Sequence, residues 1–144
     1  MTISVLIVDD EPLAREGVAL RLAQEKDIEI IGECANGSDA IRSILSLQPD
    51  LVFLDIKMPK VNGFDVVHAV GIEHMPPVIF LTAYDEYAIE AFNTHAVDYL
   101  LKPIDNARFK ESLQHARQQI LKNSIAERSE QLTDLLTKTK GLSK

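Results

Sequence analysis

The stretch SVLIVDDEP (residues 4–12) sets four consecutive apolar residues directly before three acids. An apolar run of this length predicts a buried β-strand, which we place over residues 3–8. Adjacent carboxylates repel one another, and burying even one of them without a partner is costly. Asp9, Asp10 and Glu11 therefore mark either a strand end that dips into solvent, with acids capping the next helix, or part of a cation site.

Four further apolar runs predict four more strands, over residues 28–32, 50–55, 76–82 and 96–102. Helical patterns lie between the strands, over residues 12–22, 38–48, 64–70 and 86–94. A longer helix is expected to begin near Asp105, a suitable N-cap, and to continue beyond Ile120. Because the apolar runs are continuous and do not alternate with polar residues, we expect a parallel sheet with helices on both faces, which is a doubly wound α/β fold.

Two helices carry more detailed predictions. In the first, Leu13, Val18, Leu20 and Leu22 are expected to form the apolar stripe that faces the sheet. Before the second, Asn36-Gly37 predicts a turn, and Ser38 is expected to be the N-cap.

Length and composition limit the class of protein. The chain of 144 residues, with 46% hydrophobic and 26% charged residues, is typical of one globular domain. A net charge of −7 argues against direct nucleic-acid binding by this segment, which would need clustered Lys and Arg. The single cysteine, Cys34, is interpreted as a small core residue in a reducing compartment. No signal peptide or membrane-spanning run is recognisable, so we expect a cytoplasmic protein without a membrane partner.

Polar side chains stand at the same end of four of the predicted strands. Asp9 and Asp10 follow the first strand, and Asp55 ends the third. Thr82 ends the fourth strand, and Lys102 follows the fifth. Carboxyl ends of parallel strands meet at one edge of the sheet, where doubly wound folds bind their ligands. These five side chains are therefore expected to converge.

The chemistry of this set favours phosphoryl transfer. Three converging carboxylates cannot all stay ionised without a compensating charge, and a hard cation such as Mg²⁺ would supply it. The Thr82 hydroxyl and the Lys102 ammonium are donors suited to phosphoryl oxygens. Between them, Asp55 is a natural nucleophile, as in enzymes that form an aspartyl phosphate.

The segments VLIVDDEP, LVFLDIKMPKVNGFD, VIFLTAYDE and AVDYLLKP resemble the receiver domain of two-component response regulators in the order and spacing of all five positions. The resemblance covers roughly residues 2–121. It implies a flavodoxin-like sheet of five strands in the order 2-1-3-4-5, with Asp55 as the phosphoacceptor. It also implies that Mg²⁺ (or Mn²⁺) is held by Asp55, directly by Asp10, through water by Asp9, and by the backbone carbonyl of Lys57.

The same resemblance assigns the remaining roles. Thr82, Ala83 and Lys102 would bind the phosphoryl oxygens, and the Lys102–Pro103 peptide would be cis. Tyr99 stands where the family has an aromatic residue that turns inward when the threonine engages a phosphoryl group, so Thr82 and Tyr99 would form a switch. A sensor histidine kinase is the implied partner. A homodimer is expected through the face made by the fourth helix, the fifth strand and the fifth helix.

Less specific features of the sequence indicate the subfamily and the nature of the end of the chain. DDEPLARE, TAYDEYAIEAF and AVDYLLKPI look most like receivers of LytTR-type transcription regulators, which carry a β-rich DNA-binding domain after the receiver. We divide the chain into a receiver over residues 1–121 and a linker helix or tail over residues 122–144. Either the sequence stops within a linker, which the helical spacing of Leu121, Ile125, Leu132 and Leu135 favours, or the receiver stands alone as a protein-binding module. A disordered tail is the other reading of this segment.

Three rival classes fit parts of the pattern. A haloacid-dehalogenase-type phosphatase also uses a nucleophilic Asp with Mg²⁺, but it needs a second acid where Lys57 stands. A flavodoxin shares the fold but needs a Ser/Thr/Gly-rich phosphate loop after the first strand, where this chain has acids. A degenerate receiver would not need Asp55, Thr82 and Lys102 intact. The sequence thus favours a phosphoacceptor signalling domain, which is not a metabolic enzyme but promotes its own phosphotransfer and dephosphorylation.

Overall fold

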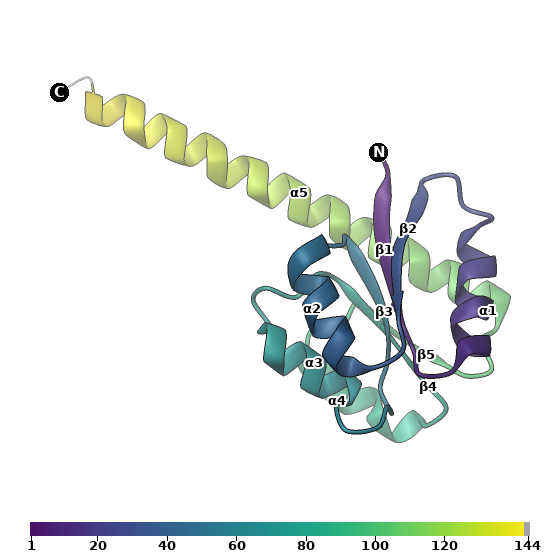
Figure 1. Ribbon diagram of the computed structural model, residues 1–144. Coiled ribbons are helices and arrows are strands. Elements are labelled where there is room, and N and C mark those ends of the chain that lie inside the picture. Colours follow the sequence, from purple (N-terminus) through teal and green to yellow (C-terminus); the bar gives the residue numbers. More distant parts are fainter. Residues whose placement is uncertain (143–144) are drawn as a thin grey trace.

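The computed structural model describes residues 1–142. Its elements follow the order β1 (Ile3–Val8), α1 (Pro12–Leu22), β2 (Ile28–Cys34), α2 (Gly37–Leu47), β3 (Leu51–Asp55), α3 (Gly63–Val70), β4 (Val78–Thr82), the 3₁₀ turn η1 (Asp85–Tyr87), α4 (Ala88–Asn93), β5 (Asp98–Leu101) and α5 (Asn106–Leu142). The strands form one parallel sheet in the order β2-β1-β3-β4-β5, with helices on both faces (Figure 1). The predicted fold class and strand order are confirmed.

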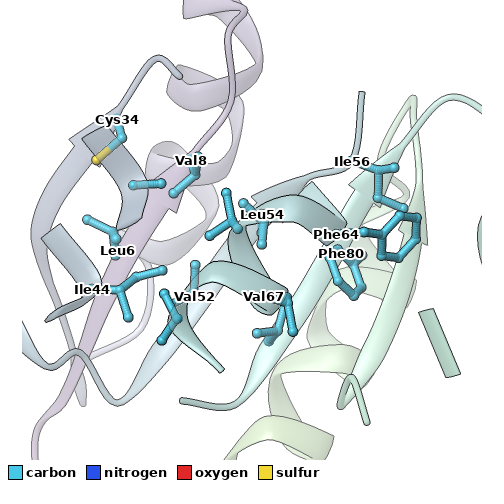
Figure 2. Close-up of a cluster of buried hydrophobic side chains, with 14 of the residues drawn as sticks. Leu6, Val8, Cys34, Ile44, Val52, Leu54, Ile56, Phe64, Val67 and Phe80 are labelled. Carbon is cyan, nitrogen blue, oxygen red and sulfur yellow. The ribbon is translucent and has the colours of Figure 1, made fainter. Parts of the chain in front are cut away.

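The continuous apolar runs arise because the central strands supply side chains to both faces of the sheet. In β1, Leu6 and Val8 join a core with residues of α2 and α3, which Figure 2 shows. Val5 and Ile7 point to the opposite face and pack with residues of α1 and α5. Alternate residues of one strand therefore belong to two separate cores, and neither set can be polar.

Some local predictions are wrong. In α1, Val18 and Leu22 are buried, but Leu13 and Leu20 are exposed, because the helix covers the sheet with a narrower stripe than expected. The N-cap of α2 is Asn36, not Ser38: the Asn36 side chain accepts a hydrogen bond from the Asp39 N–H at 2.8 Å. Ser38 lies inside the first turn of α2, where its backbone is already helical.

Other boundaries differ by a few residues. β2 continues to Cys34, two residues beyond its expected end, because residues 32–34 still pair with β1. The predicted helix over residues 86–94 is divided into η1 and α4. Cys34 is buried, as predicted.

The start of α5 is fixed by Asp105, the predicted N-cap. Its carboxylate accepts a hydrogen bond from the Arg108 N–H at 2.9 Å. One turn later, α5 is fastened to β5 through Asp98, which accepts hydrogen bonds from the side chains of Arg108 and Ser112 and lies 2.9 Å from His115 Nδ1. Burial by itself would raise the pKa of the Asp98 carboxyl, but these donors hold it well below its usual range.

Beyond the buried residue Ile120, α5 continues as one helix and projects away from the sheet (Figure 1). Within residues 1–142, no helix is both long and apolar enough to cross a membrane.

Candidate phosphorylation site

Five predicted site residues meet at the carboxyl edge of the sheet. Asp9 and Asp10 follow β1, Asp55 is the last residue of β3, Thr82 is the last residue of β4, and Lys102 follows β5. Oxygen atoms of the Asp9, Asp10 and Asp55 carboxylates all lie within 4.8 Å of one another. Asp9 and Asp55 are buried, and Asp10 is partly exposed. The carboxylates thus form a cluster that opens to solvent on one side.

Lys102 reaches into this cluster from β5. Its Nζ lies 2.7 Å from Asp9 Oδ2, 3.5 Å from Asp55 Oδ1 and 3.7 Å from Glu11 Oε1. The shortest of these contacts pairs the Lys102 ammonium with the buried Asp9 carboxylate. Burial opposes the ammonium charge, but the neighbouring carboxylates prevail and raise the pKa of Lys102, so this side chain is a fixed positive charge beside Asp55.

The loop after β1 holds Asp9 in place. Asp9 Oδ1 accepts a hydrogen bond from the Glu11 N–H at 3.0 Å, and the Asp9 carbonyl accepts one from Arg15 Nη1 at 2.7 Å. Sequence analysis did not identify Arg15 or the contact between Glu11 and Lys102. No local spacing marks these contacts, because Arg15 donates to a backbone carbonyl and Glu11 meets a residue from the far end of the sheet.

The loop after β3 passes close to the Asp55 backbone. The Gly63 N–H donates to the Ile56 carbonyl at 2.8 Å. A Cβ atom on Gly63 would lie 2.6 Å from the Asp55 carbonyl oxygen, closer than real contacts allow. At the start of α3, Asn62 and Asp65 form a capping box. Gly63 therefore lets α3 begin immediately beside the site.

Burial and the neighbouring carboxylate change the pKa of Asp55. Burial, together with the neighbouring Asp9 carboxylate, raises the pKa of Asp55 to about 7, although Lys102 acts in the opposite direction. A divalent cation among the three carboxylates would relieve this repulsion, and oxygen ligands are those that Mg²⁺ prefers. The donor set therefore fits the predicted metal.

Aromatic residues link the site to β5. The Thr82 hydroxyl accepts a hydrogen bond from the Tyr84 N–H at 3.1 Å, and the Tyr99 hydroxyl donates to the Tyr84 carbonyl. Lys57 Nζ lies over the Tyr84 ring, 4.4 Å from its centroid. Tyr84 thus contacts both predicted switch residues and the loop after Asp55.

Ala83 and the Lys102–Pro103 peptide are the two other predicted features of the site. Ala83 is exposed between Thr82 and Tyr84, and the Lys102–Pro103 peptide is cis. The roles of Ala83 and of the Lys57 carbonyl stay predictions. The four histidines are exposed, and His115 contacts Asp98, far along the chain from the site residues of β1 and β3.

Comparison with known proteins defines the class. The family model of the response regulator receiver domain matches residues 5–114. The chain therefore belongs to this family and is the receiver domain of a two-component response regulator, which is a signalling domain.

Individual relatives support the same class. The transcriptional regulatory protein BtsR of Escherichia coli (strain K12) is 52% identical over 124 residues, which is 86% of this chain and 52% of that protein. An uncharacterized response regulatory protein of Vibrio cholerae is 43% identical over 124 residues, again 86% of this chain and 52% of the relative. The chain thus spans about half the length of the curated relatives it matches.

Solved structures share the fold. The receiver domain of AraT, a response regulator from Geobacillus stearothermophilus, matches with a TM-score of 0.77 and 32% identity over 86% of this chain and 99% of that one. The response regulatory domain of mrkE from Klebsiella pneumoniae matches with a TM-score of 0.76 and 31% identity over 83% and 99% of the two chains.

Proposed function

We propose that this receiver domain accepts a phosphoryl group on Asp55 from the phosphohistidine of a sensor histidine kinase. The observation that carries the proposal is the surroundings of the Asp55 carboxylate, which shares one cluster with the acids Asp9 and Asp10 and lies 3.5 Å from the Lys102 ammonium. A buried nucleophile beside a cation-binding cluster and a fixed positive charge is suited to attack on a phosphoryl group.

Phosphoryl transfer to Asp55 exchanges a P–N bond for a P–O bond. An ionised Asp55 oxygen attacks phosphorus and forms the new P–O bond. The P–N bond to the kinase histidine breaks, and its electron pair stays on the imidazole nitrogen. Lys102 and Thr82 then donate to the phosphoryl oxygens, with the Ala83 N–H as a third donor.

The acidic cluster supports this step by holding a metal. Asp9, Asp10 and Asp55, with the Lys57 carbonyl, would bind Mg²⁺ (or Mn²⁺). When bound, the cation neutralises charge on the carboxylates and on the phosphoryl oxygens. The same residues would promote loss of the phosphoryl group to water, so the domain would itself limit the lifetime of its phosphorylated form.

Phosphorylation with a small donor tests the proposal. With acetyl phosphate and Mg²⁺, the wild-type chain should gain one phosphoryl group, detected as a mass increase, and Asp55→Asn should gain none. Asp10→Ala should lose nearly all phosphorylation while its free energy of unfolding stays equal or rises, because like-charge repulsion is relieved. Asp134→Ala, an exposed acid on α5, is the matched control and should behave as wild type. Wild-type phosphorylation of Asp10→Ala would contradict the metal assignment.

We propose transcriptional control as the output of this domain. We propose that the chain is a LytTR-type receiver, that residues 122–144 form a linker helix toward a DNA-binding domain, and that phosphorylation strengthens a homodimer through the face of α4, β5 and α5. Support comes from the quoted subfamily segments, from the name of the BtsR relatives as transcriptional regulatory proteins, and from their greater length. The alternative is a receiver that acts alone as a protein-binding module.

A further inference from the structure

Arg15 is a charged residue beside the acidic cluster that has no part in the transfer step proposed for Asp55. It lies near the start of α1, where its backbone N–H donates to the Glu11 carbonyl at 3.1 Å. Its side chain turns back past that end of the helix. Nη1 donates to the Asp9 carbonyl at 2.7 Å, and Nε lies 3.5 Å from Glu33 Oε1. One guanidinium thus joins α1 to the end of β1 and to β2.

The turn between β1 and α1 depends on this contact because its own residues cap the helix poorly. Within the described part of the chain, the N-cap residue Glu11 makes no capping hydrogen bond through its side chain. Pro12, at the start of the helix, has no N–H to donate. Arg15 therefore supplies, from the helix, a tether that a capping side chain would normally supply from the turn.

Both peptides that flank Asp10 are held in place. The peptide between Asp9 and Asp10 is planar, so the bond from Arg15 to the Asp9 carbonyl also fixes the Asp10 nitrogen and Cα. The next peptide is held because the Glu11 N–H donates to Asp9 Oδ1 at 3.0 Å. Asp9 is in turn anchored to β2, since its N–H donates to the Cys34 carbonyl at 3.1 Å. These contacts set the direction in which the Asp10 side chain leaves the backbone.

Asp10 is the member of the acidic cluster for which this direction matters most. Asp9 and Asp55 are buried, and the Lys102 ammonium contacts both of their carboxylates. Asp10 is partly exposed, so its carboxylate is less confined by its surroundings. Removal of a group that orients a metal ligand typically weakens metal binding by about 10–100-fold.

We propose that Arg15, supported by Glu33, is a positioning residue that orients Asp10 toward the divalent cation. This role rests on the metal site proposed for Asp9, Asp10 and Asp55. The guanidinium also carries a positive charge, which by itself disfavours a cation nearby. Positioning and charge therefore act on cation binding in opposite directions, and the contacts of Arg15 make positioning the larger effect.

Titration of the metal-free chain with MgCl₂, followed through its amide NMR signals, separates the two effects. In Arg15→Ala, the dissociation constant for Mg²⁺ should rise by about fivefold to tenfold, because the backbone at Asp10 loses its support. Loss of the positive charge alone would lower the same constant. An unchanged or lower dissociation constant in Arg15→Ala would overturn the proposal.

Two further measurements report on positioning directly. In the metal-free chain, the Glu11 amide hydrogen should exchange with solvent several-fold faster in Arg15→Ala, because the turn opens more readily. With acetyl phosphate, Arg15→Ala should need several-fold more Mg²⁺ for half-maximal phosphorylation, yet reach the wild-type rate when Mg²⁺ is saturating. Unchanged exchange of the Glu11 amide would contradict the role of Arg15 in holding the turn.

The matched control is Arg117→Ala, which also removes one arginine together with its ion pairs, here to Glu25 and Asp27. These pairs tie α5 to the segment before β2, at the opposite edge of the sheet from Asp55. The control should bind Mg²⁺ and exchange its Glu11 amide like wild type. Equal changes in the two variants would overturn the proposal. Failure of the wild-type chain to bind Mg²⁺ would instead refute the metal site itself, and the positioning role with it.

Discussion

Asp55 is a buried carboxyl that shares its surroundings with the carboxylates of Asp9 and Asp10. In the folded protein its pKa is raised from 3.8 to about 7, so the folded state binds a proton more tightly than the unfolded chain. Between these two pH values, the free energy of unfolding therefore falls as pH rises. Without a metal, the residue suited to phosphorylation destabilises the fold.

Replacing Asp55 by Asn removes this charge, and the variant should be more stable than wild type by roughly 1–3 kcal/mol at neutral pH in the presence of a chelator. The gain should shrink toward pH 4, where the wild-type carboxyl is protonated in the folded state. Urea unfolding at several pH values measures both effects. A gain that does not depend on pH would contradict an electrostatic cause.

Lys57 and Tyr84 lie two residues after Asp55 and Thr82, and their side chains contact each other. Water would approach the phosphoryl group in line with the breaking P–O bond, and we infer from the positions of Lys57 and Tyr84 in the chain that their side chains border that approach. Tyr84→Ala should therefore speed loss of phosphate several-fold, and Lys57→Ala should do so more weakly, because Tyr84 would lose only its cation–π partner. Phosphate loss is measured after removal of acetyl phosphate, with Lys60→Ala as the control. Unchanged or slower loss in Tyr84→Ala would rule out steric shielding.

At the scale of elements, the junction of β3 and α3 depends on one glycine. Gly63→Ala would force its Cβ against the Asp55 carbonyl oxygen, so we expect a loss of roughly 2 kcal/mol or more in the free energy of unfolding and slower phosphorylation. Gly17→Ala in α1 is the matched control, because the nearest atom is the flexible end of Arg21. It should gain up to about 1 kcal/mol through helix propensity. Urea unfolding distinguishes them, and equal stabilities would contradict the close approach.

The elements and the converging residues at the sheet edge could be predicted because each leaves a local signal. Continuous apolar runs mark strands buried on both faces, and a polar residue at the end of such a run must lie at the carboxyl edge. Contacts between residues that lie apart in the chain could not be predicted, because neither partner carries a local signal. Asp98 looks like an ordinary polar residue of a strand, and only folding brings Arg108, Ser112 and His115 to it. Asn36 displaced Ser38 as the N-cap because both suit the role and only the backbone decides.

On the scale of the whole molecule, the Tyr99 hydroxyl contacts the Tyr84 carbonyl, two residues after Thr82. If phosphorylation draws the Thr82 hydroxyl toward Asp55, this contact and the face around β5 should rearrange. We expect Mg²⁺ with beryllofluoride, a mimic of the phosphoryl group, to tighten self-association measured by sedimentation. The mimic can shift the equilibrium between the present and the rearranged conformation only by the difference between its affinities for the two.

Tyr99→Ala should reduce this shift and leave phosphorylation intact. Equal association constants for wild type with and without beryllofluoride would show that dimerisation is not the output of phosphorylation.

The fastening of α5 to β5 through Asp98 has a mechanical consequence. About 30 residues of α5 lie beyond Ser112, and at 1.5 Å per residue they form a lever roughly 45 Å long. Its fulcrum is the turn that carries Arg108 and Ser112, which share Asp98 with the strand of Tyr99. A tilt of about 5° at that fulcrum would sweep the far end of the lever through roughly 4 Å. A small change of angle at β5 would thus become, at the far end of α5, a movement of about three-quarters of a helical turn.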